Sequence, residues 1–137
     1  IVSLVQRGGS VRSFHVASAD KDTVQTILKQ NVDSASRLYT DESPLYRGAK
    51  VLDHETVRHS AAEYVRGSVH TNTIEGYFSI FKRGMRGIYQ HCKEKHLHRY
   101  LAEYDFRYNH RTALGYNDPE RAALAIKSAT GKRLTYR

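Results

Sequence analysis

An amphipathic helix is predicted between residues 72 and 86, and the rest of the fold has to accommodate it. Its apolar side chains recur at i, i+3, i+4 and i+7, the spacing of one helix face, at Ile74, Tyr77, Phe78 and Phe81. Its polar side chains form a second stripe, at Glu75, Ser79, Lys82 and Arg86. The first stripe requires a core to pack against. The second stripe lies on another side of the helix. Within it, a carboxylate precedes a lysine by two turns.

Short strands separated by turn residues are predicted upstream of this helix. We expect, in chain order, a hairpin with strands at 1–6 and 11–17, a helix capped by Asp22 and ending near Asn31, a strand at 36–40, a loose turn at 43–49 and a strand at 54–59. A polar connector then leads to the amphipathic helix.

Helices dominate the downstream part of the chain. Gly84 and Gly87 are predicted to loosen the backbone before a second long helix, 93–109. Asp118 and Pro119 form a cap and a first turn for a short helix that ends near Ile126. Strands followed by helices indicate an α/β fold in which helices flank a mixed sheet. The length of 137 residues fits a single domain.

The charge of the chain is unevenly distributed. The formal net charge is +8, and residues 61–137 hold 14 Lys and Arg against 7 Asp and Glu, whereas residues 1–60 are nearly balanced. Such an excess favours DNA or RNA over a membrane as the partner, because no lipid-facing stretch accompanies it. Cys92 is the single cysteine, so no intrachain disulfide forms and a reducing, cytoplasmic compartment is expected.

Basic residues of the second half are the candidates for contacts with a nucleic-acid backbone. They are Lys82, Arg83, Arg86, Lys93, Lys95, Arg99, Arg107 and Arg111. The alternative is that these charges only solvate the exposed sides of helices.

Two acidic positions are candidates for chemistry. Glu75 begins the polar stripe, where a carboxylate could hold a divalent cation while Lys82 reaches a phosphate. From the pattern alone, a capping box between Asn72 and Glu75 is the better explanation. Asp41 follows a predicted strand, the position at which α/β sheets place ligands, although Asp also favours turns.

The motifs HTNTIEGYFSIFKRG at 70–84, YTDE at 39–42, RHSAAEYVRGSVHTN at 58–72 and RYLAEYDFRYNHR at 99–111 resemble DDE-type transposases of bacterial insertion sequences. They are most similar to the group with an Asp, Asp, Asn or Glu, Lys signature. The resemblance implies an RNase H-like fold, two Mg²⁺ or Mn²⁺ ions, cleavage at the ends of a DNA element and joining of those ends to target DNA. It also implies a homo-oligomer assembled on DNA.

Site residues follow from the resemblance position by position. Asp41 matches the second acidic residue and Lys82 matches the lysine. Glu75 or Asn72 matches the third position, and Glu75 ranks first because an anion binds Mg²⁺ better than an amide does. His59 and His70 match positions that support the site.

The resemblance also implies missing parts. Its first Asp lies on a strand upstream of residue 1, so we expect a partial catalytic domain, 1–137, that lacks its first strand and is inactive alone. Residues 112–137 are expected to form a C-terminal extension with a short helix. The alternatives are a truncated remnant that binds DNA without cutting it, and an unrelated RNA-binding protein.

Overall fold

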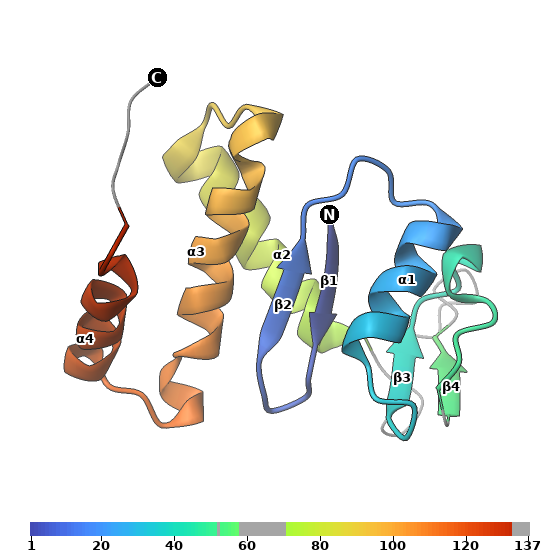
Figure 1. The fold of residues 1–137 in the computed structure, drawn as a ribbon. Coiled ribbons are helices and arrows are strands. Elements are labelled where there is room, and N and C mark those ends of the chain that lie inside the picture. Colours follow the sequence, from blue (N-terminus) through green and yellow to red (C-terminus); the bar gives the residue numbers. More distant parts are fainter. Residues whose placement is uncertain (52, 58–70, 133–137) are drawn as a thin grey trace.

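The computed structural model describes residues 1–51, 53–57 and 71–132, which form a mixed α/β arrangement (Figure 1). Two small sheets lie beside and between the helices, and the helices of the second half gather on one side. No helix among the described residues is both long enough and apolar enough to span a bilayer.

The first sheet is the predicted hairpin. β1 (Val2–Val5) pairs antiparallel with β2 (Val11–Phe14), with Ser3 opposite Ser13. The connecting turn is closed by a 2.8 Å hydrogen bond from the Gln6 amide to the Ser10 carbonyl. Gly8 adopts a φ of 64° in this turn, a conformation that glycine reaches without steric cost. The hairpin prediction is therefore confirmed.

The second sheet is parallel and separate from the hairpin. β3 (Arg37–Thr40) pairs with β4 (Asp53–Thr56), and Arg37 lies opposite Asp53. Among the described residues the strands form two separate sheets and not the single mixed sheet expected, because no described strand joins β1 to β3. The strand expected at 54–59 begins one residue earlier, and its last two positions lie outside the described residues.

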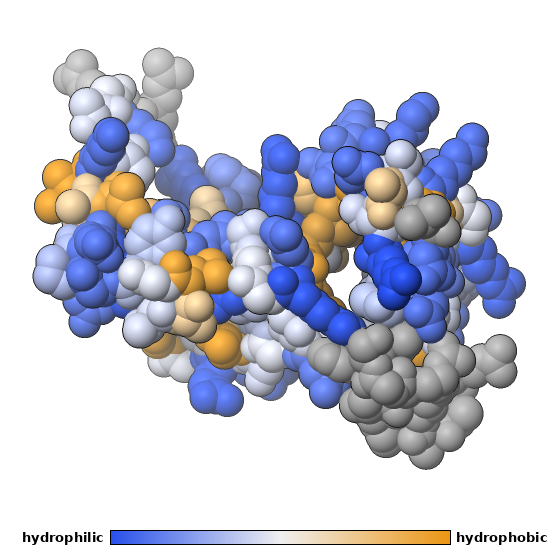
Figure 2. All heavy atoms as spheres, turned by 90° about the horizontal axis from the view of Figure 1, so that it is seen from below, coloured by the Kyte–Doolittle hydropathy of each residue, from blue (hydrophilic) through white to orange (hydrophobic). Residues whose placement is uncertain are grey.

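Helix α1 (Lys21–Asn31) supplies the core that both sheets share. Val24, Ile27 and Leu28 are buried with Val2 of β1. Side chains from both sheets pack against this cluster, among them Leu4, Phe14 and Leu38. Figure 2 shows the surface hollowed between the part that carries the hairpin and the part that carries α1 and the second sheet.

The N-cap of α1 differs from the prediction. Asp20, not Asp22, caps the helix, and its carboxylate accepts a 2.9 Å hydrogen bond from the Thr23 amide. Asp20 has the extended backbone that a cap requires, whereas Asp22 already lies in the first turn.

Helix α2 (Asn72–Gly84) has the predicted apolar stripe. Tyr77 and Phe81 are buried, and Ile74 and Phe78 pack against them at the edge of the same cluster. The sequence predicted that the backbone would loosen at Gly84. The helix continues there instead, into a π-helical turn, Met85–Tyr89. Gly84 is buried because the hydroxyl of Tyr104 occupies the space where a side chain would lie.

Helix α3 (Leu97–Asn109) follows a short 3₁₀ turn, Glu94–His96, so the α-helix begins four residues later than predicted. Its buried residues, Leu101 and Tyr104, face α2 and the hairpin. The ring of Tyr104 meets that of Phe81 edge-on, with centroids 5.1 Å apart.

Side chains of α3 also satisfy the outer backbone edge of β2. Asn109 accepts from the Val11 amide at 2.6 Å and donates to the Val11 carbonyl at 2.9 Å. Asp105 accepts from the Ser13 amide and the Ser13 hydroxyl, both at 2.7 Å, and from the Tyr77 hydroxyl at 2.5 Å. Burial, followed by the bond to Asp105, raises the pKa of Tyr77. These contacts tie β2, α2 and α3 together.

Helix α4 (Asp118–Ala129) is the last described helix and ends three residues beyond the predicted Ile126. Its cap is Asn117 rather than Asp118. Asn117 and Glu120 form a reciprocal capping box, with bonds of 2.9 and 3.0 Å. None of its residues is buried, and Figure 2 shows hydrophobic side chains exposed over it.

Adding a methyl group at Gly84 is expected to destabilise the α2–α3 contact. The new Cβ of Gly84→Ala would overlap the Tyr104 hydroxyl and force the two helices apart. We expect the free energy of unfolding to fall by about 1–3 kcal/mol. Gly76→Ala is the matched control, because nothing lies near its Cβ and alanine favours helix by about 1 kcal/mol. Urea denaturation of both variants measures this, and equal stabilities would contradict the contact.

Removing the Asp105 carboxylate is expected to detach α3 from β2. Asp105→Ala leaves the Ser13 amide and the Tyr77 hydroxyl without their acceptor. The free energy of unfolding should fall by about 2–3 kcal/mol. The control is Asp118→Ala, whose side chain is 92% exposed and should cost less than about 1 kcal/mol. Similar losses in both variants, measured by chemical denaturation, would contradict the anchoring role of Asp105.

Candidate functional site

Asp41 lies directly after β3, at the strand end where it was predicted. One carboxylate oxygen accepts a 3.0 Å hydrogen bond from the Ser43 amide, which fixes the side chain in a local turn. The Asp41 carbonyl accepts from the Thr40 hydroxyl at 2.9 Å. Burial of Tyr46, followed by the charge of Asp41, raises the pKa of the Tyr46 phenol. The Asp41 side chain is itself exposed and can accept a ligand.

Glu75 lies in the first turn of α2 and does not form the predicted capping box. The N-cap is Thr71 and Asn72 is the first helical residue, so Asn72 is one position too late to cap. The Thr71 hydroxyl donates a 2.6 Å hydrogen bond to the Glu75 carboxylate. Thr71 is nearly fully buried, and it therefore orients an exposed carboxylate at the helix end whose dipole favours an anion.

Thr71 was missed by the sequence reasoning. Its spacing of four residues from Glu75 was a usable signal, since side chains at i and i+4 meet on one side of a helix. The signal was ambiguous because Asn72, at a spacing of three, offered a competing cap.

Lys82 lies two turns after Glu75, at the edge of a basic hollow. This hollow has a volume of about 540 Å³ and is lined by Ser79, Lys82, Arg83, Arg86 and Gly87. None of the ion pairs found among the described residues involves its three cations. Cations grouped around an open hollow suit a phosphate group.

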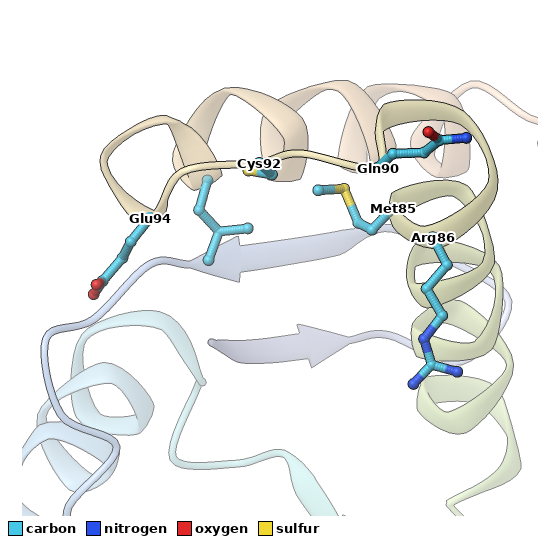
Figure 3. A pocket seen from close by; sticks show the side chains of 6 residues that line it. Met85, Arg86, Gln90, Cys92 and Glu94 are labelled. Atoms are coloured by element: carbon cyan, nitrogen blue, oxygen red, sulfur yellow. The ribbon is translucent and has the colours of Figure 1, made fainter.

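A second hollow adjoins the first at Arg86, which lines both. It measures about 450 Å³ and lies between the end of α2 and the start of α3 (Figure 3). Met85 points into it from the π-helical turn, and Cys92 lies on the segment that crosses above it. The second hollow is not itself basic, since Arg86 is the one cation of its lining and Glu94 is also part of it.

The remaining predicted DNA contacts divide into two kinds. Lys93, Lys95 and Arg99 are exposed. Arg107 and Arg111, in contrast, are held by protein groups: Arg107 donates to Glu103 at 2.8 Å, and Arg111 lies 3.9 Å over the Tyr108 ring and donates to the Gly9 carbonyl.

Arg107 belongs to a small hydrogen-bonded group on α3. The Tyr89 hydroxyl donates to Glu103 at 2.6 Å, which raises the pKa of Tyr89 to about 12. Partial burial of Glu103 is outweighed by its bonds from Tyr89 and Arg107, so the pKa of Glu103 is lowered.

The predicted metal ligands do not form a complete site within the part of the chain that is described. There, no three His, Cys, Asp or Glu side chains come together in an arrangement that could hold a metal ion. Asp41 and Glu75 offer the hard oxygen ligands that Mg²⁺ prefers, from two different elements. His59 and His70, the predicted supporting residues, lie outside the described residues.

Comparison with known proteins identifies one family. A family model described as an ISXO2-like transposase domain matches residues 1–109, from β1 to the end of α3. The matched region contains Asp41, Glu75 and Lys82, and it stops before α4. Searches of the curated proteins and of the solved structures give no significant match.

Removing cations from the basic hollow is expected to weaken DNA binding and its salt dependence together. Loss of one phosphate contact should reduce the slope of log K against log[salt] by about 0.9. Lys82→Ala/Arg83→Ala should therefore lower the slope by up to about 1.8. The control pair, Lys21→Ala/Lys29→Ala, removes the same charge from exposed positions on α1. Fluorescence anisotropy with a labelled duplex measures both. Equal slopes in the two pairs would exclude the hollow as a contact.

Proposed function

The chain belongs to the ISXO2-like transposase domain family, and we propose that it carries part of the catalytic site with which an insertion-sequence transposase cuts DNA ends and joins them to a target. The observation that carries this proposal is the family match over the whole segment that holds Asp41, Glu75 and Lys82. Both carboxylates are exposed and each is oriented by a neighbouring donor.

Each of the three residues has a distinct role in the proposed reaction. Asp41 and Glu75 would hold Mg²⁺ or Mn²⁺, and the ion would supply activation of the attacking oxygen and charge stabilisation at the leaving oxygen. The Thr71 hydroxyl holds the Glu75 carboxylate in position. Lys82 binds a DNA phosphate beside the scissile bond. Asn72 precedes Glu75 by one helical turn and is the alternative third ligand, a weaker one because it is neutral.

An RNase H-like architecture is part of the proposal, and the hydrogen-bonding directions of β1 support it. Val11 and Ser13 turn their backbone groups toward α3, so their partners Val5 and Ser3 turn theirs away from β2. That edge of β1 faces the side on which β3 lies (Figure 1). A strand between β1 and β3 would merge the two sheets into one.

The same strand would complete the metal site. We propose that it lies upstream in a longer chain and carries the first Asp of the motif, as the resemblance implies. Residues 1–137 would then be inactive alone. A second candidate is a remnant that binds DNA without cutting it, and one observation favours it: no three His, Cys, Asp or Glu side chains of the described residues come together to hold a metal ion.

A strand-transfer assay separates these possibilities. The substrate is a labelled duplex that carries the element end, with Mg²⁺ or Mn²⁺, and the proteins are residues 1–137 and a version extended upstream by the genomic sequence. We expect activity only in the extended form. Asp41→Asn and Glu75→Gln should each reduce its rate by more than about 100-fold, a larger loss than the 10–100-fold typical of groups outside the metal ligands.

Asp33→Asn is the matched control, because Asp33 is also an exposed carboxylate that accepts from a local backbone amide, that of Ala35. Its activity should be unchanged. Full activity in Asp41→Asn or Glu75→Gln would overturn the catalytic assignment. Inactivity of the extended form with DNA binding retained would identify the remnant.

A further inference from the structure

The segment that joins α2 to α3 is held in a fixed shape. The Gln90 amide bonds to the Met85 carbonyl at 2.9 Å, and Gln90 has a φ of 47° at the end of the π-helical turn. Tyr89 anchors the segment to α3, because its hydroxyl bonds to Glu103 and its ring centroid lies 4.6 Å from that of Tyr100. Side chains that leave this segment therefore project from a defined surface.

That surface concentrates positive and titratable charge. We name it the hinge cluster, and its members are His91, Lys93, Lys95, His96, His98 and Arg99. The acidic residue within the same stretch is Glu94, which is 80% exposed on its side chain and lies 3.7 Å from His15 of the segment after β2. None of the ion pairs among the described residues neutralises a member of the hinge cluster.

The members of the hinge cluster repel one another. The pKa of His96 is lowered by local desolvation and then by the charges of Lys95, Arg99, His98 and Lys93. From the neighbouring elements, Arg86 lies across the hollow that Glu94 also lines, and His15 lies beside Glu94. A polyanion bound here would relieve this repulsion and favour the protonated histidines.

We propose that the hinge cluster is a second DNA-backbone contact, separate from the Asp41, Glu75 and Lys82 site, and that its binding of phosphates takes up protons. This inference rests on DNA being the partner in the proposed function. It adds a regulatory property, because the affinity for DNA then rises as the pH falls.

The direction follows from linkage. In the free protein, local desolvation and the neighbouring positive charges lower the pKa of His96 and so favour its neutral form. Phosphates bound beside the histidines favour the protonated form of the imidazole instead. The affinity for DNA therefore rises as the pH falls through the pKa values that the histidines have in the bound state. It levels off below the pKa values of the free protein. A shift of one unit on one histidine corresponds to about a 10-fold change in affinity.

The test is the affinity of the 137-residue chain for a labelled duplex at pH 8 and pH 6, in EDTA and at constant ionic strength. We expect binding to be about 10-fold tighter at pH 6. The variant His91→Gln/His96→Gln/His98→Gln should bind like the parent at pH 8 and lose most of the gain at pH 6. Lys93→Ala/Lys95→Ala/Arg99→Ala should bind more weakly at both pH values.

The control is Lys21→Ala/Lys29→Ala/Lys50→Ala. It removes as many exposed positive charges as the Lys93, Lys95 and Arg99 variant, at positions remote in sequence from the hinge cluster, and should keep the full pH dependence. Circular dichroism at both pH values checks that each variant is folded. If the histidine variant keeps the pH dependence of the parent, or the parent shows none, the inference is overturned while DNA binding through the basic hollow stands. If the parent binds no DNA at either pH, the proposed function falls with it.

Discussion

The outer edge of β2 is the contact on which the arrangement of the second half depends. In an isolated antiparallel hairpin, the outer edge of each strand has unpaired backbone donors and acceptors. Such a hairpin is unstable and prone to aggregate. Here Asp105 and Asn109, one turn apart on α3, replace a neighbouring strand and satisfy the amides of Ser13 and Val11. Because Asp105 also accepts from Tyr77, the same carboxylate sets the position of α2. The helix that carries Glu75 and Lys82 is thus located by a polar contact as well as by its apolar stripe.

The first half is held by a different constraint. α1 offers one apolar side to two sheets that share no ladder among the described residues, so hydrophobic burial, together with the Arg7 guanidinium 4.3 Å from the Tyr39 ring centroid, sets the distance between Asp41 and the hairpin. Hydrophobic contacts are non-directional and fix such a distance less tightly than a strand ladder does. In the proposed function the outer edge of β1 therefore matters: a strand paired there would fix Asp41 relative to Glu75, and the proposed metal-assisted phosphoryl transfer would need such placement.

Local patterns predicted the elements well and their ends poorly. The stripe of Ile74, Tyr77, Phe78 and Phe81 identified α2 and its buried side, because helical periodicity depends only on sequence spacing. The three helix caps were each misplaced by one or two residues, since neighbouring residues were chemically suitable and only the backbone angles decide between them. Gly84 was predicted to loosen the helix because the sequence does not reveal that the hydroxyl of Tyr104, on another helix, needs its space. The candidate carboxylates came from local signals and from the resemblance, whereas the donors that orient them depend on local backbone geometry.

α2 is a rigid spacer between the proposed catalytic carboxylate and the proposed DNA-binding surface. Glu75 and Lys82 are seven residues apart, so about 10 Å of helix separates them along its axis. The basic hollow lies at the C-terminal end of α2, and the hinge cluster follows a π-helical turn whose backbone stays hydrogen-bonded. A DNA strand held along this side would therefore present its phosphates to the Glu75 end in a fixed register. Under the proposal, a change in the charge of the hinge cluster would then alter the affinity for this strand and leave the geometry at the carboxylates unaltered.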